Sequence, residues 1–354
     1  MKKVFWFVLT LALVLSACGA PAPVATEAPA AEVPAATEAP AATEAPAATE
    51  APAAEPFRVA VVMPSATTDL AFGQSMYDAL VRIQEEMGAE NFEFVYSEGM
   101  FVVDDAAAAI RDYATQGFDL IIAHGSQYGS SLQEIAPDFP ETSFAWGTTV
   151  DTFGLPNVFA YEALSQEGGY VNGVMAAKLT KSKVVGVVGP IETGDAKLYV
   201  DGFKAGVTAT DPAIQVNVNY IGSFSDVALA SEAATTHISA GADVLTGSAQ
   251  MVVGAIGKAE EANALWFGTQ SNQASLAPSI VVASQVYHWE VILNEMIGLI
   301  KGGTLGGQSF AANLKNGGQV IEFNDGYALP ADVKALADET IKGVVDGTIT
   351  ITLP

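Results

Sequence analysis

Residues 58–80 read RVAVVMPSATTDLAFGQSMYDAL, and the character of this stretch changes twice. The Val-rich run at 58–63 is typical of a parallel strand covered on both faces, and a proline ends it. Polar residues follow at 65–74, and apolar residues then return at helical spacing. The stretch therefore predicts a strand, a loop and a helix. Because ligands of open α/β sheets bind beyond the carboxyl ends of the strands, this loop is expected to form the first wall of a binding site.

The same alternation of short apolar strands and amphipathic helices continues along the chain, then restarts near the middle. It predicts an α/β protein of two Rossmann-like, doubly wound lobes with right-handed connections and a ligand cleft between the lobes. Further strands are expected at 92–96, 119–124, 144–147, 183–188, 215–220, 243–246, 265–268 and 281–284, and helices at 104–116, around 132–136, at 167–179, around 205–207, and at 226–239, 254–262 and 286–299.

The C-terminal part is expected to return to both lobes. Lobe 1 is predicted to comprise 57–161 and 285–318, and lobe 2 to comprise 162–284 and 319–354. Within the last segment, 319–323 and 327–329 suggest a small hairpin around an Asn-Asp-Gly turn, followed by a helix at 331–345.

The N-terminal region has the composition of a leader and a tether. Residues 1–17 carry two lysines, a short apolar run and small residues, as a secretory signal does. Leu15 to Cys18 resembles a bacterial lipobox, which implies cleavage before Cys18 and lipidation of this cysteine; an uncleaved anchor or a secreted protein is the alternative. Residues 18–56 consist almost entirely of Ala, Pro, Thr and Glu and predict a disordered tether.

Composition excludes several classes of function. The formal net charge of −25 argues against binding nucleic acid, since affinity for phosphate backbones comes from Lys and Arg. The segment 189–195 (GPIETGD) has the glycine spacing of a P-loop, but Asp195 occupies the position of the phosphate-binding lysine. Three separate histidines and one cysteine offer no metal cluster, so no cofactor or metal is expected. Of the histidines, only His124 ends a strand on the predicted cleft side.

Seven short motifs in register resemble the basic membrane protein family. Its members are lipoprotein substrate-binding components of ABC importers with the type I periplasmic-binding-protein fold. The resemblance runs from about residue 58 to about 299 and rests on DLAFGQS (69–75), QGFDLI (116–121), IAPDFP (135–140), EGGYVNG (167–173), GFKAG (202–206), YIGSFSD (220–226) and GADV (241–244).

The resemblance implies a purine nucleoside or base as ligand, held between aromatic rings. It places Asp69, Phe72 and Gln74 on the contact loop of the first lobe. At 268–273 the family usually carries Gly-Val-Asp-Ser-Asp-Gln, whereas this chain has Gln270 and Asn272 at the two acidic positions. An amide accepts at one end and donates at the other, unlike a carboxylate that accepts two bonds from a ribose diol. The departure favours a free base or another small polar ring compound.

The residues themselves leave several roles open. Asp69 is either a ligand contact or the N-cap of the following helix, or both. Phe72 lies between small residues and is expected to stack on a ligand rather than join a core. Trp266, inside an apolar strand, is expected in a core. The candidate ligand contacts are Asp69, Phe72, Gln74, Ser126, Tyr128, Trp146, Gln250, Gln270, Asn272 and Trp289, with Tyr128 and Trp146 equally compatible with a core and Trp289 expected to cap the cleft from the side.

The sequence therefore predicts a lipid-anchored, extracytoplasmic solute-binding protein at the cell membrane, not an enzyme. It is expected to be a monomer that binds a purine-like small molecule and delivers it to the permease of an ABC importer. Two alternatives stay open: a ligand-sensing subunit for a signalling membrane protein, and a tethered nucleoside hydrolase with Asp69 as its base.

Overall fold

The Val-rich run becomes the central strand β1 (Phe57–Val62) in the computed structural model, which describes residues 55–353. All but one of its residues are buried, and it pairs in parallel with a strand on either side. Helix α1 (Phe72–Met87) starts at Phe72, so the loop that follows β1 ends three residues earlier than the polar composition suggested. Phe72 and Gln74 thus lie in the first turn of a helix, where the helical geometry fixes the direction of their side chains.

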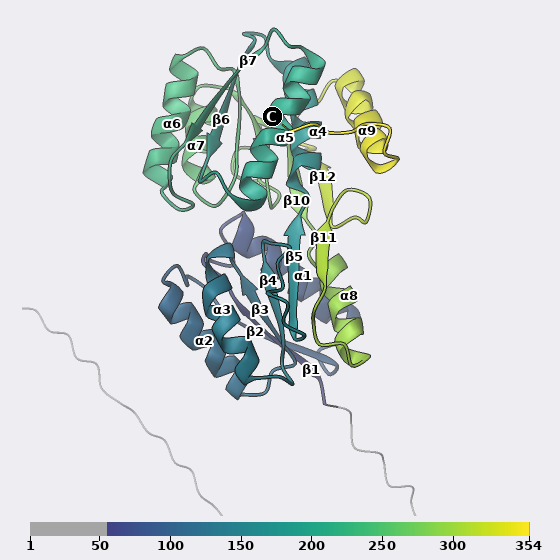
Figure 1. Cartoon of the computed structure of the whole chain (residues 1–354). Helices are drawn as coiled ribbons and strands as arrows, with labels where there is room; N and C mark the ends of the chain where they lie inside the picture. Colours follow the sequence, from purple (N-terminus) through teal and green to yellow (C-terminus); the bar gives the residue numbers. More distant parts are fainter. Residues whose placement is uncertain (1–54, 354) are drawn as a thin grey trace, which may run out of the picture. The chain divides into compact units, whose positions relative to one another are not determined.

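The first sheet has the strand order β11-β5-β4-β3-β1-β2, with every pair parallel. Helices α1 and α8 cover one face and α2 and α3 cover the other, which is the doubly wound arrangement (Figure 1). We call this sheet and its helices lobe 1. Its other elements are β2 (Phe92–Ser97), α2 (Val103–Thr115), β3 (Leu120–His124), α3 (Gly129–Ile135), β4 (Ser143–Gly147), β5 (Val158–Ala163), α8 (Glu290–Lys301) and β11 (Ser309–Ala312).

The second sheet has the order β12-β10-β9-β8-β6-β7 and is parallel except for β12, which runs antiparallel to β10. Helices α4, α5 and α9 cover one face and α6 and α7 the other, and together they form lobe 2. Its elements are α4 (Ser165–Leu179), β6 (Val184–Gly189), α5 (Gly194–Thr210), β7 (Gln215–Tyr220), α6 (Val227–Ser239), β8 (Val244–Gly247), α7 (Val252–Glu261), β9 (Leu265–Gly268), β10 (Val281–Tyr287), β12 (Gln319–Phe323) and α9 (Ala331–Val345).

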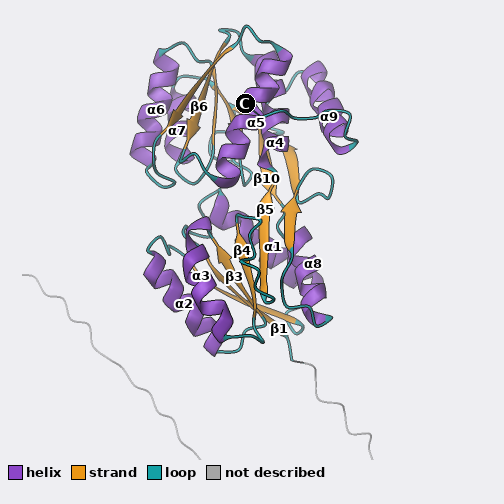
Figure 2. Ribbon diagram, viewed as in Figure 1, coloured by secondary structure: helices purple, strands orange, loops and turns teal. Residues whose placement is uncertain are grey.

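Three segments connect the lobes, which belong to one compact unit. They run from β5 to α4, from β10 to α8 and from β11 to β12, and Figure 2 shows β5 and β10 in the region where the two lobes meet. The predicted fold class, two doubly wound lobes, is therefore confirmed. The carboxyl ends of the parallel strands in both lobes face the gap that these segments span, so the loops that follow the strands form its walls.

Two C-terminal predictions are wrong. Residues 286–287 belong to strand β10 rather than to a helix, because β10 extends to pair with β12 as far as Tyr287. Residues 319–323 do not form a hairpin with 327–329. The side-chain amide of Asn324 donates instead to the carbonyl oxygens of Pro278 and Val281, which ties the end of β12 to lobe 2.

Two strands lack the pattern that predicts strands. β5 and β11 pair with each other at the edge of the first sheet, and neither was expected. The leader at 1–17, Cys18 and nearly all of the tether lie outside the described residues. Within 55–353, none of the helices combines the length and the apolar character that crossing a membrane requires.

Candidate ligand-binding site

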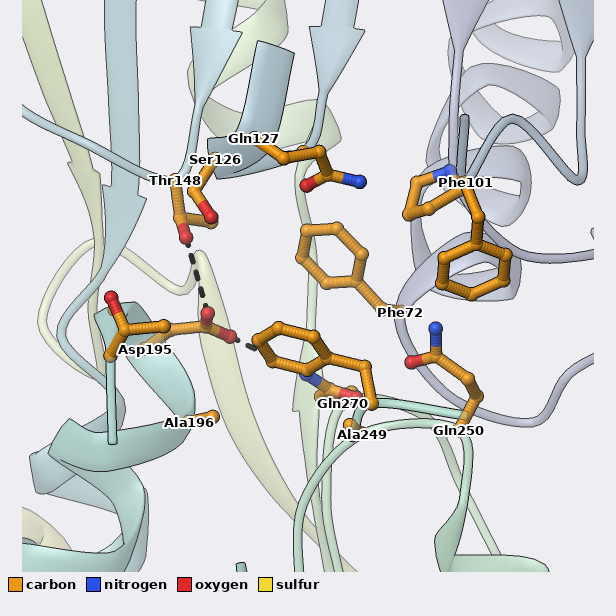
Figure 3. Close-up of a pocket in the computed structure, with 15 residues that line it drawn as sticks. Phe72, Phe101, Ser126, Gln127, Thr148, Asp195, Ala196, Ala249, Gln250 and Gln270 are labelled. Carbon is orange, nitrogen blue, oxygen red and sulfur yellow. Dashed lines mark hydrogen bonds between the residues drawn. The ribbon is translucent and has the colours of Figure 1, made fainter. Parts of the chain in front are cut away.

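A cavity of about 260 Å³ lies between the two lobes, and Figure 3 shows the side chains around it. Lobe 1 supplies the loops after its strands and the start of α1, and lobe 2 supplies the start of α5 and the loops after β7, β8 and β9. The lining residues are Pro64, Phe72, Phe101, Gly125, Ser126, Gln127, Thr148, Thr193, Gly194, Asp195, Ala196, Phe224, Ala249, Gln250 and Gln270.

Phe72 forms an aromatic wall that is braced from behind by His124. The two rings stack with centroids 3.8 Å apart and planes 10° apart. The Nε2–H of His124 donates to the carbonyl oxygen of Phe72 (3.2 Å), so Nδ1 is left to accept from the hydroxyl of Tyr161 (2.6 Å). Burial lowers the pKa of His124 to about 3, which keeps the imidazole neutral. The Phe72 ring is therefore fixed before any ligand arrives.

Two further phenylalanines line the cavity. Phe101 follows β2 in lobe 1 and is 44% exposed, and Phe224 follows β7 in lobe 2. Aromatic faces from both lobes suit a flat ring, since stacked rings gain about 0.5–1.5 kcal/mol beyond the buried area.

Asp195 is the charged side chain of the cavity, and it lies in the first turn of α5. Its Oδ1 accepts from the hydroxyl of Thr148 (3.2 Å), and its Oδ2 accepts from the hydroxyl of Tyr287 (2.8 Å) and from Nε2 of Gln270 (3.4 Å). Burial raises the pKa of Asp195, and these donors offset part of that shift. Because Thr148 belongs to lobe 1, the carboxylate is bonded to both lobes.

Two residues of the lobe 2 wall have left-handed backbone conformations. Gln270 has φ +69° and Ala249 has φ +74°, and both line the cavity. Non-glycine residues with such torsions cost on the order of 1–3 kcal/mol and gather at ligand sites. Gln270 is only 2% exposed, and its Oε1 has no hydrogen-bond partner among the described residues. A buried acceptor without a partner is a position for a ligand donor.

Four of the predicted contacts line the cavity: Phe72, Ser126, Gln250 and Gln270. They come from both lobes and from four separate loops or helix starts, as the strand-end argument requires.

Asp69 and Gln74 are close to the cavity but do not line it. Asp69 caps α1, because its carboxylate accepts from the backbone N–H groups of residues 71, 73 and 74. The capping alternative thus describes its contacts, and a role as a ligand contact stays a prediction. Gln74 points instead to a second, polar hollow near the lobe connections, and its Oε1 accepts from the backbone N–H of Leu70.

Tyr128 and Trp146 pack in a core of lobe 1 and do not line the cavity. Tyr128 is fully buried and donates to the carbonyl oxygen of Met100 (2.7 Å). Trp146 donates to the carbonyl oxygen of Gly125 (3.2 Å) and stacks on Phe153. For both, the packing alternative describes what the side chain touches.

Asn272 and Trp289 also lie outside the cavity. Asn272 is exposed and donates to Glu322 (2.6 Å). Trp289 is fully buried, donates to the hydroxyl of Ser75 (2.9 Å) and packs edge-on against Tyr161. It supports the aromatic layer behind Phe72 and does not cap the cleft. Trp266 is buried, as expected for a core residue.

The loop at 268–273 contacts lobe 1 directly. The hydroxyl of Ser271 donates to the carbonyl oxygen of Ala71 (2.9 Å), and Nε2 of Gln273 donates to that of Leu70 (3.2 Å). These bonds, with the one between Thr148 and Asp195, hold the lobes together around the cavity. Among residues 55–353, no group of three or more His, Cys, Asp or Glu side chains could hold a metal ion.

The lining residues that the sequence did not single out as ligand contacts include Asp195, Thr148, Phe101 and Phe224. Each follows the end of a strand, the same signal that pointed to the loop at 65–74. Asp195 was considered only as the residue that spoils a P-loop. Its position after β6 was the informative feature.

A model of the family Bmp, described as ABC transporter substrate-binding protein PnrA-like, matches residues 57–351. A purine-binding protein of Brucella abortus is 26% identical over 295 residues, which are 83% of each chain. An ABC transporter nucleoside-binding protein of Lactococcus lactis is 25% identical over 313 residues, which are 81% of this chain and 86% of the relative.

Solved structures share the fold at lower identity. An ABC transporter solute-binding protein from Aeropyrum pernix superposes with a TM-score of 0.72 at 21% identity, covering 84% of this chain and 94% of its own. One from Conexibacter woesei has a TM-score of 0.70 at 23% identity, covering 84% and 99%.

Proposed function

The chain belongs to the Bmp family of ABC transporter substrate-binding proteins, and from this premise we propose that it is the solute receptor of an importer for purine bases or nucleosides. The observation that carries the proposal is the cavity between the lobes, where a braced aromatic wall and polar groups from both lobes converge. Sites of small ligands typically combine apolar walls with a few convergent polar groups.

A purine suits the chemistry of the lining. Phe72 and Phe224 come from different lobes and both line the cavity, and aromatic side chains stack well on flat rings. Gln127, Gln250 and Gln270 bring amides, each of which donates and accepts, to the edges of the same cavity. Relatives described as purine-binding and nucleoside-binding support this ligand class.

The size of the cavity favours a compact ligand. Its volume of about 260 Å³ is slightly below the usual range of ligand sites, roughly 300–1,000 Å³. Asn272 is outside the cavity, and Gln270 is an amide already bonded to Asp195. Neither residue supplies the pair of free carboxylate oxygens that suits a ribose diol, so a base is favoured over a nucleoside.

Delivery to a permease follows from closure of the lobes. Contacts that a ligand makes with both lobes exist only when the lobes are together, so binding shifts the population toward the closed state. A permease that recognises this state would accept loaded receptors and ignore empty ones.

The rival function, a nucleoside hydrolase based on Asp69, lacks its base in the cavity. Both carboxylate oxygens of Asp69 accept backbone N–H groups at the start of α1. A receptor returns its ligand unchanged, and we propose this behaviour for the protein.

We further propose that lipidation of Cys18 holds the receptor on the extracytoplasmic face of the cell membrane as a monomer. A Cys18→Ser variant is expected to lose incorporation of labelled fatty acid and to appear in the soluble fraction. Membrane retention and labelling of the variant at the level of the native chain would contradict the anchor.

A thermal-shift screen of residues 56–354 tests the ligand class. A ligand that binds only the folded state at a hundred times its Kd adds about 2.7 kcal/mol to the free energy of unfolding. The expected result is a higher melting temperature with purine bases, and a smaller effect or none with nucleosides. A shift with nucleosides alone would overturn the preference for a base, and a shift only with sugars or amino acids would overturn the purine assignment.

A further inference from the structure

We propose, on the basis of the solute-receptor function, that Asp195 and Gln270 select ligands that carry two adjacent N–H donors and no negative charge. The chemical class is an amino-substituted heterocycle with an amidine-like edge, as in guanine. Nothing in the family match specifies this pair, because it depends on an aspartate at the start of α5 that bonds to a glutamine from another loop.

The lining of the cavity contains one charged side chain. Asp195 is acidic, and the other residues that line the cavity are apolar, hydroxyl-bearing or amide-bearing or are glycines, so no Lys or Arg of the described chain faces the ligand there. An anionic ligand would therefore be placed beside a buried carboxylate without a compensating cation, at a large electrostatic cost. Phosphorylated compounds are excluded on this ground.

Asp195 and Gln270 each have a hydrogen-bond acceptor position that no described residue fills. A carboxylate has about four acceptor positions, and Asp195 uses three for Thr148, Tyr287 and Gln270. The amide of Gln270 presents its nitrogen to Asp195, so its oxygen points elsewhere. That oxygen is buried and has no partner among the described residues.

The two acceptors are therefore neighbours. The free Oε1 of Gln270 is one amide group away from the carboxylate to which its Nε2 donates, and both residues line the cavity (Figure 3). A single N–H would leave one of the two unpaired, which is costly for a buried group. A pair of adjacent N–H groups on one edge of a ring would fill both.

Residues on the segments that connect the lobes hold the carboxylate of Asp195 in place. Tyr287 ends β10, immediately before the connection to lobe 1, and its hydroxyl donates to Asp195. Ser165, at the start of α4 after another connection, is bonded to the same hydroxyl at 2.6 Å. The carboxylate is thus oriented by groups on the segments about which the lobes would rotate.

The test measures the Kd of the full-length protein by calorimetry for ligands that differ only in the exocyclic amino group. Guanine is compared with hypoxanthine, and guanosine with inosine. We expect the amino compound to bind about tenfold tighter or more, and guanosine 5′-monophosphate to show no binding. Equal affinities within twofold, or a nucleotide that binds as tightly as guanosine, would overturn the proposal.

Variants of Asp195 and Gln270 test whether these two residues cause the preference for the amino compound. Asp195→Asn is expected to weaken guanine binding about ten- to a hundredfold, since charge-assisted hydrogen bonds are the strong ones. Gln270→Leu is expected to reduce guanine to the affinity of hypoxanthine. The matched control is Asp332→Asn, which removes an exposed charge from the first turn of α9 and should leave both Kd values unchanged. If Asp195→Asn does not fold, the Kd ratio of hypoxanthine to guanine is compared between the native chain and Gln270→Leu. A ratio that is the same in both would overturn the proposal.

Two monocyclic compounds, isocytosine and uracil, distinguish a failure of the purine function from a failure of the donor-pair proposal. Isocytosine has adjacent N–H donors and uracil lacks the amino group. If purines fail and isocytosine binds in a manner that requires Asp195, the donor-pair proposal stands without the purine function. If neither class binds, the proposal is overturned together with that function.

Discussion

His124 shows how one buried side chain can determine the shape of a binding surface. It touches no ligand position itself, yet it stacks on Phe72 and donates to the carbonyl oxygen of the same residue. A neutral imidazole can do this, whereas a charged one would have to be buried without a counter-ion. The aromatic wall of the cavity therefore depends on the protonation state of a residue behind it.

Acid should destabilise the protein through His124. The unfolded chain takes up a proton on this residue near pH 6.5, whereas the folded pKa is about 3. The stabilising contribution is thus complete above pH 6.5 and is lost as the pH falls toward 3, by up to ~1.4 kcal/mol per pH unit. Denaturant unfolding between pH 5 and 6.5 measures the slope.

A His124→Gln variant is the comparison for this slope. The variant is expected to be less stable at pH 7. The slope of its free energy of unfolding against pH is expected to be smaller, by an amount that corresponds to at most one proton. His237 is also buried with a lowered pKa and remains in both proteins, so it contributes equally to each. Parallel pH profiles of the native chain and the variant would contradict the role given to His124.

At the residue scale, more of the predicted loops than of the predicted side chains line the cavity. Phe72 was predicted to stack on a ligand from its small neighbours, and it lines the cavity. Asp69 and Asp195 both follow a strand, but the first caps a helix and the second faces the cavity. Asp69 accepts from the backbone of its own helix, whereas Asp195 accepts from side chains distant in the sequence, and one-dimensional spacing does not reveal such tertiary donors.

At the scale of elements, helices α4 and α5 pack unusually closely. Glycines on each helix allow the two backbones to meet: a Cβ on Gly206 would lie 2.1 Å from the carbonyl oxygen of Tyr170, and one on Gly202 would lie 2.2 Å from that of Gln166. Since Asp195 is in the first turn of α5, this packing positions the carboxylate of the cavity.

Gly206→Ala should therefore destabilise the protein by roughly 1–3 kcal/mol or more, because the added methyl group meets backbone that cannot move aside. The matched control is Gly257→Ala on α7, where a Cβ meets no atom within 4 Å and the change should stabilise by up to ~1 kcal/mol. Thermal or urea unfolding distinguishes the two. Equal effects of both substitutions would contradict the close-packing account.

Elements with a strong period were predictable, and those held by tertiary pairing were not. The helix at 331–345 and the strands at 215–220 and 265–268 have their predicted bounds. β11 is a four-residue edge strand whose only described strand partner is β5, so pairing rather than local pattern defines it. The false hairpin after β12 arose from an Asn-Asp-Gly turn whose asparagine bonds to a different segment.

At the scale of the whole molecule, the lobes meet through few direct bonds. The hydroxyl of Ser271 donates to the carbonyl oxygen of Ala71, and the hydroxyl of Thr148 donates to Asp195. Two tandem βα series with return connections predicted a cleft, but the pairs that bridge it are up to 203 residues apart in the chain. No local pattern could have matched them.

Ser271→Ala should weaken ligand binding without touching the cavity. Loss of a bond that exists only between closed lobes costs about 1 kcal/mol of closure, which corresponds to a roughly fivefold higher Kd. The matched control, Ser130→Ala on the exposed side of α3, should leave the Kd unchanged. Calorimetric titration with the purine that binds most tightly gives the comparison. A Kd unchanged in Ser271→Ala would mean that this contact does not report closure.

The central claim is that the cavity between the lobes takes up a purine and returns it unchanged. The most direct measurement is equilibrium dialysis of the protein against radiolabelled guanine and guanosine, followed by chromatography of the recovered ligand. We predict saturable binding of one guanine per chain and full recovery of intact compounds. Release of guanine from guanosine would instead identify a hydrolase, and an absence of saturable binding of either compound would contradict the receptor account.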